Sequence, residues 1–295
     1  MVLAVKLKLA LAAAMLAATA AGPAMIAGPA DHSAAALPPE MIRLPPSVVR
    51  HRLVGDFTRA GRPVNAPVVT AEVAGFSIMI RQVTGAEYRR CAEDGACPAA
   101  AADVSPHADR PMVKASWRDA QAYAAWLSRT TGQAYRLPTD AEWAYAAGDR
   151  LRDDALPESP DDEVRDPSKR WLARYAQEAA RETEAERGPQ PTGAFGANDR
   201  GLLDIAGNVW EWTSTCFHRV ALDAEGRRTG DESVNCGVRV VEGRHRSYMS
   251  DFIRDARSGG CAVGTPPGNL GFRLVRDDGL WQRLQAGLRG RLPSL

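Results

Sequence analysis

Apolar and polar residues alternate loosely along residues 68–80, where Phe76, Ile78 and Ile80 fall at every second position. A period of two places successive side chains on opposite faces of a sheet. We therefore predict one or two strands over residues 68–80.

Three helix starts are indicated by capping boxes, in which Ser or Thr is followed three residues later by Glu or Asp. The boxes open helices predicted over residues 84–91, 116–130 and 139–147. In the second helix, apolar residues at helical spacing form a stripe that faces the core. Gly132 then ends this helix, because glycine readily adopts the left-handed conformation of a C-terminal cap.

The first 47 residues have a different composition from the rest of the chain. Two lysines precede an apolar run at residues 9–21, and small residues follow, so residues 1–20 are predicted to be a secretory signal peptide. The alternative is an uncleaved membrane anchor, although a bilayer needs about 20 apolar residues. Residues 21–47, rich in Ala and Pro, are predicted to be a flexible linker. We therefore expect a periplasmic or secreted protein.

The remaining sequence predicts one domain over residues 48–277. It carries a charged insertion at 150–190, including a helix predicted over 168–187, and then a loop-rich stretch with short strands at 190–276. The tail at 278–295 has apolar residues at helical spacing. It is predicted to form an amphipathic helix that docks on the domain or associates weakly with a membrane surface.

Composition excludes one class of partner. The 295 residues carry a net charge of only +1, and the leader holds two of the lysines. A near-neutral mature chain has no basic surface of the kind that binds nucleic acid, so we expect no nucleic-acid partner.

Five cysteines bear on the redox environment. Cys91 and Cys97 flank a short loop and are a candidate disulfide, as expected outside the cytoplasm. Cys216, Cys236 and Cys261 leave two interpretations: one more disulfide with an inert buried thiol, or a reactive thiol.

Four separated blocks of sequence carry a family resemblance. They are VTGAEY at 83–88, PMVKASW at 111–117 with YRLPTDAEW at 135–143, GLLDIAGNVWEW at 201–212, and GNLGFR at 268–273. In order and spacing they resemble the formylglycine-generating enzyme family, also called sulfatase-modifying factors. This resemblance implies an α+β fold, the irregular C-type-lectin-like fold of that family.

The third block is a candidate calcium site. Asp204 and Glu211 are hard oxygen donors, and Gly207 permits a tight turn that exposes carbonyl groups. The resemblance places calcium ligands at Asp204, Glu211 and the carbonyls of Gly207 and Val209. The alternative is that Glu211 pairs with an arginine and the neighbouring tryptophans anchor the core.

The resemblance also implies copper, held by two cysteines in the segment that corresponds to residues 245–258. Met249 and Arg254 occupy those two positions. Thiolates hold Cu(I), whereas a guanidinium is not a practical metal ligand. We therefore expect the usual copper site to be missing, and copper remains a candidate cofactor without evident ligands.

The same segment is nevertheless a candidate substrate cleft, rich in arginine and aspartate. Its candidate residues are His245, Ser247, Tyr248, Met249, Asp251, Arg254 and Arg257. The alternative is an Arg–Asp network that only stabilises loops.

Two related branches of the family, the ergothioneine synthases and the pyoverdine-maturation proteins, suggest further functions and cofactors. The first uses iron bound by histidines of an extra N-terminal domain. The five histidines of this chain show no clustered ligand spacing, so iron also lacks evident ligands.

Function is therefore expected in one of two classes. The first is an extracytoplasmic maturation factor that acts on a protein or peptide, with metal-dependent oxidation left open. The second is a non-catalytic, lectin-like module that binds a peptide, a glycan or a partner protein. Conventional sulfatase activation is a third and weaker option.

Overall fold

The structure is a computed structural model that describes residues 38–99, 108–153, 155, 169, 172, 176, 188–230, 232–255 and 269–277. Several predictions lie outside these residues. They are the signal peptide, the linker as far as residue 37, most of the 168–187 helix, Arg257, Cys261 and the tail.

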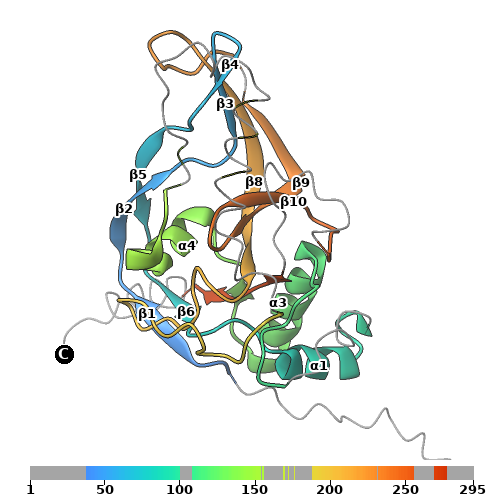
Figure 1. Cartoon of the computed structure of the whole chain (residues 1–295). Coiled ribbons are helices and arrows are strands. Elements are labelled where there is room, and N and C mark those ends of the chain that lie inside the picture. The colour runs from blue at the N-terminus through green and yellow to red at the C-terminus, as the bar shows by residue number, and fades with distance from the viewer. Residues whose placement is uncertain are drawn as a thin grey trace, which may run out of the picture. The chain divides into compact units, whose positions relative to one another are not determined.

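The described strands form three sheets (Figure 1). The first, in the order β1-β6-β12-β7, contains β1 (Met41–Leu44), β6 (Phe76–Met79), β12 (Val275–Arg276) and β7 (Tyr135–Arg136). The second, in the order β10-β9-β8-β3-β4, contains β10 (Ser247–Ser250), β9 (Ser233–Glu242), β8 (Trp210–Leu222), β3 (Asp56–Arg59) and β4 (Arg62–Val64), with β11 (Leu270–Gly271) beside β8. The third pairs β2 (Ser47–Arg52) with β5 (Val68–Val73).

Strands β5 and β6 confirm the prediction for residues 68–80. Strand β1 corrects the predicted linker boundary, because it lies within residues 21–47 and pairs antiparallel with β6. Leu44 stands opposite Phe76, and both side chains are buried. The folded domain therefore begins before Val48, since the apolar residues of β1 have a partner strand that sequence alone did not reveal.

All three predicted helix starts are confirmed. The helices are α1 (Gly85–Glu93), α3 (Trp117–Thr131) and α4 (Asp140–Ala147), followed by a 3-10 turn, η1 (Gly148–Arg150). Each α-helix has both hydrogen bonds of its capping box, and Gly132 ends α3 with φ of 69°. No described helix is both long enough and apolar enough to cross a bilayer.

Strands β8 and β9 are longer than the short strands expected for residues 190–276. They span 13 and 10 residues and pair antiparallel, with register shifts near Cys216. The Cys216–Cys236 disulfide links the two strands. The apolar periodicity of this stretch is weak, which explains why the sequence did not predict two long strands here.

The core surrounds these strands on two sides. In Figure 1, α1 and α3 lie on one side of β8 and α4 lies on the other. Tyr123 of α3 packs against Tyr88 of α1 and Phe272, with ring centres 5.9 and 5.5 Å apart. On the side of α4, Trp143 packs with Phe76 and Ile78 in a second cluster. Segments far apart in sequence are thereby held around the 201–212 block.

A buried network of charged side chains joins β2, α4 and β9. Asp140 lies 3.1 Å from both His51 Nδ1 and Arg246 Nη2, and Arg246 Nε donates to Glu242 over 2.6 Å. Burial alone would raise the pKa of Asp140, but the nearby Arg246 and His51 outweigh it and lower the pKa from 3.8 to about 2. The ionised form of Asp140 therefore stabilises the fold above the pKa of an unfolded aspartate.

The substitution Asp140→Asn tests this network. At neutral pH it is expected to lower the free energy of unfolding by about 2 kcal/mol, because hydrogen bonds to a charged group are lost. The folded-state pKa of Asp140 is depressed, so the wild-type advantage is lost as pH falls from about 4 toward 2. Urea unfolding at pH 7 and pH 3 measures both values. A difference between wild type and variant that did not shrink at pH 3 would contradict this account.

Candidate functional site

Glu211 of β8 lies at the point where the sequence blocks of the chain meet. Its carboxylate is fully buried and accepts two hydrogen bonds from Arg273, from Nε over 2.7 Å and from Nη2 over 2.8 Å. Gln82 Nε2 and Trp143 Nε1 donate to the same carboxylate over 2.7 and 3.0 Å. Both oxygens of Glu211 are therefore occupied by protein donors, and its charge is balanced by a fully buried guanidinium.

Asp204 is equally well satisfied. Its two carboxylate oxygens accept hydrogen bonds from the backbone N–H groups of Gly193 and Phe195, over 2.6 and 2.8 Å. The carbonyl of Gly207 accepts from the N–H of Val209 over 2.6 Å. Asp204, Ala206 and Asn208 all have positive φ near 57°, which is uncommon for residues other than glycine. The backbone of residues 204–208 is therefore strained, and hydrogen bonds within the loop keep it in this conformation.

The guanidinium of Arg150 also contacts this loop. Arg150 donates to the carbonyls of Phe195 and Ala197 over 3.0 and 2.9 Å, and reaches those of Gly196 and Ile205 over 3.3 and 3.5 Å. The four carbonyl oxygens come from two arms of the loop, before and after Asp204. Arg150 thus supplies positive charge and hydrogen bonds where backbone oxygens converge.

These contacts bear on the predicted calcium site at Asp204, Gly207, Val209 and Glu211. Calcium takes six to eight oxygen ligands, but the carboxylates here already accept from protein donors, and Arg273 lies against Glu211. The arrangement does not suit calcium at this pair and favours the alternative, in which Glu211 pairs with an arginine. Across the described ranges, no group of three or more His, Cys, Asp or Glu side chains is placed to hold a metal ion. Calcium binding was predicted from the sequence, and these hydrogen bonds now lead us to expect none at this pair.

Four residues of the predicted cleft are buried instead of lining a groove. The ring of His245 packs against Trp210 with centres 5.2 Å apart, and Ser247 is also buried. The hydroxyl of Tyr248 accepts a hydrogen bond from the N–H of Gly55 over 2.8 Å. Met249 belongs to the core cluster beside α3, with no exposed surface. Ser247, Tyr248 and Met249 are consecutive residues of β10 and all are buried, so both faces of this strand are covered.

The end of the same segment reaches the surface at the start of α3. Arg254 forms a two-pronged ion pair with Asp119, with distances of 2.6 and 2.8 Å, and Asp251 pairs with Arg118 over 3.1 Å. Burial would raise the pKa of Asp119, but hydrogen bonds from Arg254 and Ser116 outweigh it and lower the pKa. The predicted residues Asp251 and Arg254 are thus brought together, whereas Arg257 lies outside the described residues.

Aromatic groups flank these ion pairs. The guanidinium of Arg239 lies 4.1 Å from the centre of the Trp117 ring, and Phe252 is 61% exposed. We call this set the α3 surface; its members are Trp117, Arg118, Arg239, Asp251, Phe252 and Arg254. Sequence reasoning did not assign Arg118 to a site. Trp117 was seen only as part of a family motif.

The described chain contains two disulfides. Cys91 and Cys97 are joined at the end of α1, as their spacing suggested. Cys216 pairs with Cys236, which agrees with the interpretation of one further disulfide. The Nη1 of Arg239 lies 3.1 Å from Cys216 Sγ, so the second bridge adjoins the α3 surface.

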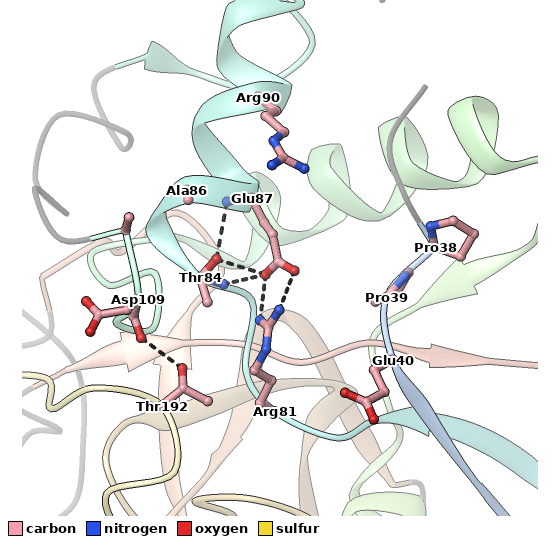
Figure 2. Close-up of a pocket in the computed structure, with 11 residues that line it drawn as sticks. Pro38, Pro39, Glu40, Arg81, Thr84, Ala86, Glu87, Arg90, Asp109 and Thr192 are labelled. Carbon is pink, nitrogen blue, oxygen red and sulfur yellow. Dashed lines mark hydrogen bonds and ion pairs between the residues drawn. The ribbon is translucent and has the colours of Figure 1, made fainter. Parts of the chain in front are cut away.

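A separate cavity of about 490 Å³ opens beside the start of α1 (Figure 2). Arg81 forms a two-pronged ion pair with Glu87, over 2.7 and 2.8 Å, and Glu87 also completes the capping box at Thr84. Burial would raise the pKa of Glu87, but Arg81 outweighs it and lowers the pKa. In Figure 2, Arg90 lies above Glu87 on the same helix, α1, and Pro38 lies on a separate segment to the right of both. The charges of the Arg81–Glu87 wall are already compensated, so this wall serves chiefly to hold α1.

The fold defines an α+β protein whose irregular loops are held by buried arginines, and comparison with known proteins identifies the class. Residues 29–278 match the sulfatase-modifying factor enzyme 1-like domain, and the chain belongs to that family. A solved structure agrees on the fold: PvdO from Pseudomonas aeruginosa superimposes with a TM-score of 0.51 at 21% identity, over 81% of this chain and 94% of PvdO.

Curated relatives include proteins named for opposite activities. The chain is 34% identical to a formylglycine-generating enzyme of Streptomyces coelicolor, over 66% of this chain and 60% of the relative. It is 33% identical to the inactive C-alpha-formylglycine-generating enzyme 2 of Bos taurus, over 54% of this chain and 53% of the relative. The matched part thus spans less than two thirds of either relative.

We expect the thermal unfolding temperature to be the same in calcium and in a calcium chelator. Bound calcium at a hundred times its dissociation constant would add about 2.7 kcal/mol and raise this temperature by several degrees. Scanning calorimetry of the disulfide-bonded protein measures the shift. A rise in calcium that disappears in Glu211→Gln would instead support the calcium prediction.

The loop-holding role of Arg150 has its own control within the chain. Arg150→Met removes donors from loop carbonyls and is expected to lower the unfolding temperature by several degrees, at roughly 1 kcal/mol per lost hydrogen bond. Arg152→Met, at an exposed position two residues away, is expected to leave it unchanged. Equal effects of the two substitutions would contradict the role given to Arg150.

Proposed function

We propose that the chain is an extracytoplasmic maturation factor that recognises a protein or peptide at the α3 surface, without copper-dependent oxidation of a cysteine. Family membership supports a role related to maturation. One observation supports the absence of copper chemistry. At the two positions that resemble the copper cysteines, Met249 is fully buried in the core and Arg254 is ion-paired with Asp119.

Electrostatics explains why this pair of residues favours binding over copper chemistry. A copper ion would need soft donors that both face one point. The Met249 side chain has no exposed surface, and Arg254 brings a permanent positive charge that repels a cation. The relative named as inactive supports the view that this fold also exists without the oxidation reaction.

The chemistry of the α3 surface is suited to a polypeptide. Phe252 offers an exposed ring, and Trp117 with Arg239 offers a stacked aromatic and cationic pair. Tryptophan, arginine and other aromatic residues contribute most of the binding energy in many protein interfaces. Arg118, whose side chain is 66% exposed, can also pair with an acidic group of a ligand. We infer a preference for extended peptides that combine apolar and acidic residues.

The two disulfides support the proposed location. Disulfides persist in oxidising compartments and are rare in the cytosol. Cys91–Cys97 and Cys216–Cys236 are both formed in the described chain. Together with the predicted signal peptide, they favour a protein that works after export.

Peptide recognition is tested by selection from a random displayed-peptide library, followed by fluorescence anisotropy with a selected peptide. Phe252→Ala and Trp117→Ala are each expected to weaken binding at least tenfold, about 1.4 kcal/mol, as for central interface aromatics. Val48→Ala is the control, because Val48 is equally exposed but lies on β2. Failure to select any peptide whose binding depends on Phe252 or Trp117 would refute the proposed surface.

The absence of oxidation is tested separately. A peptide with a sulfatase-type CxPxR sequence is expected to keep its cysteine thiol after incubation with the protein, copper, oxygen and a reductant. Mass spectrometry detects the change, and the formylglycine-generating enzyme of Streptomyces coelicolor serves as the positive control. Conversion by wild type that is lost in Met249→Leu would overturn this part of the proposal.

A further inference from the structure

The two disulfides of the described chain differ in their access to solvent. Cys91 and Cys97 are 0% and 6% exposed, so the core covers their bridge. In the other bridge, Cys236 lies in a run of five exposed residues at the start of β9, whereas Cys216 of β8 is half-buried. Exposed disulfides are the ones that exchange readily with external thiols. A thiol from outside the protein can therefore approach the second bridge from the side of Cys236.

The less exposed sulfur of this bridge is in contact with an arginine. Arg239 of β9 stands opposite Cys216 of β8 in the strand register. Its Nη1 lies 3.1 Å from Cys216 Sγ and donates to the carbonyl of Ser214 over 2.7 Å. The strand pairing therefore places a positive charge beside one sulfur of the bridge.

The charge of Arg239 is poorly compensated. Within the part of the chain that the structure describes, Arg239 makes no ion pair with a carboxylate, and its Nε is buried without a hydrogen-bond partner. Its other close contact is the ring of Trp117. Burial lowers the pKa of Arg239, and the negative charge of Asp251 offsets this effect only in part. An anion next to this guanidinium would therefore be stabilised.

Opening the bridge creates such an anion. When a thiolate attacks one sulfur of a disulfide, the other sulfur leaves as a thiolate. A cation beside a cysteine lowers the pKa of its thiol, and a thiol of lower pKa leaves faster. Exposure favours attack at Cys236, and Arg239 favours departure of Cys216. The two features thus define one direction for the reaction.

We propose that Cys216–Cys236 is a redox-active disulfide that oxidises pairs of cysteine thiols in a polypeptide substrate. A substrate thiolate attacks Cys236 Sγ, a mixed disulfide forms, and Cys216 leaves as a thiolate beside Arg239. The second substrate thiol, after loss of its proton, attacks the substrate sulfur of the mixed disulfide and releases Cys236. The substrate loses two electrons and two protons, which convert the bridge to two thiols. No metal and no oxygen takes part in this exchange.

Exchange with glutathione tests this proposal on the native, disulfide-bonded protein and does not depend on peptide recognition at the α3 surface. After exposure to reduced glutathione, alkylation and mass spectrometry report the state of each cysteine. Cys216–Cys236 is expected to open at least ten times faster than Cys91–Cys97, with glutathione attached to Cys236. Equal rates for the two bridges, or glutathione attached to Cys216, would overturn the proposal.

The role of the arginine is tested with Arg239→Met, which removes the charge and keeps a long side chain. In glutathione buffers this substitution is expected to shift the equilibrium at least tenfold toward the disulfide, because the Cys216 thiolate loses its counterion. Arg219→Met is the control, since Arg219 lies on β8 and its guanidinium contacts the ring of Phe217 at 5.6 Å. If the bridge only links two strands, Arg239→Met will leave the equilibrium unchanged, and the proposal fails.

The pKa of the Cys216 thiol gives a second readout. Cys236→Ser leaves Cys216 as a thiol, and the pH dependence of its alkylation by iodoacetamide measures this pKa. We expect a value at least one unit below that of a free cysteine, about 8.5, and a return toward the free value when Arg239→Met is added. A Cys216 pKa at or above the free value in Cys236→Ser would contradict the stabilisation of its thiolate.

Discussion

The buried ion pair between Arg273 and Glu211 is the interaction on which the rest of this structure depends. Two fully buried charges are tolerated only when they are paired and their remaining hydrogen-bonding groups are satisfied. Arg273 meets this condition through Glu211 and three backbone carbonyls, those of Met79, Ile80 and Leu203. Gln82 and Trp143 donate the remaining hydrogen bonds to the carboxylate of Glu211. The ion pair therefore joins strand β6, helix α4, the loop before β8 and the end of the domain.

Arginine performs the same task elsewhere in the fold. Arg150 gathers loop carbonyls, Arg246 holds Asp140 and Glu242, and Arg254 holds Asp119. A chain with long irregular loops cannot satisfy its backbone groups through regular secondary structure alone. A planar guanidinium carries five donors in a rigid geometry and so can hold several oxygens at once. Arginine thus holds the loops and also occupies one of the two positions that resemble the copper cysteines, residue 254.

Local signals in the sequence were sufficient for the helices and for β5 and β6. Capping boxes act within four residues, and alternation acts within one strand, so both can be read without knowledge of the fold. Strand β1 depends on β6, a partner distant in sequence, and no local signal revealed it. Strands β8 and β9 are neighbours along the chain, but their residues lack the clear alternation that a prediction from sequence needs. The disulfide between Cys91 and Cys97 was predictable because only a short loop separates the two residues.

The site was predictable in part. The substitution of Met249 and Arg254 for cysteines was visible in the sequence, but the burial of His245, Tyr248 and Met249 was not, because both faces of β10 are covered. Glu211 was predicted to bind calcium, with pairing to an arginine as the alternative. In the structure it pairs with Arg273, in agreement with the alternative. The pair of His51 and Asp140 brings together residues 89 positions apart along the chain, which no spacing rule detects.

The central claim is that the α3 surface, and not a metal centre at residues 249 and 254, is where the protein meets its partner. Hydrogen–deuterium exchange with and without a bound peptide tests this claim most directly. The account predicts slower exchange at residues 116–122 and 250–254 when the peptide is bound. Protection confined to other parts of the chain, with no change at the start of α3, would contradict it.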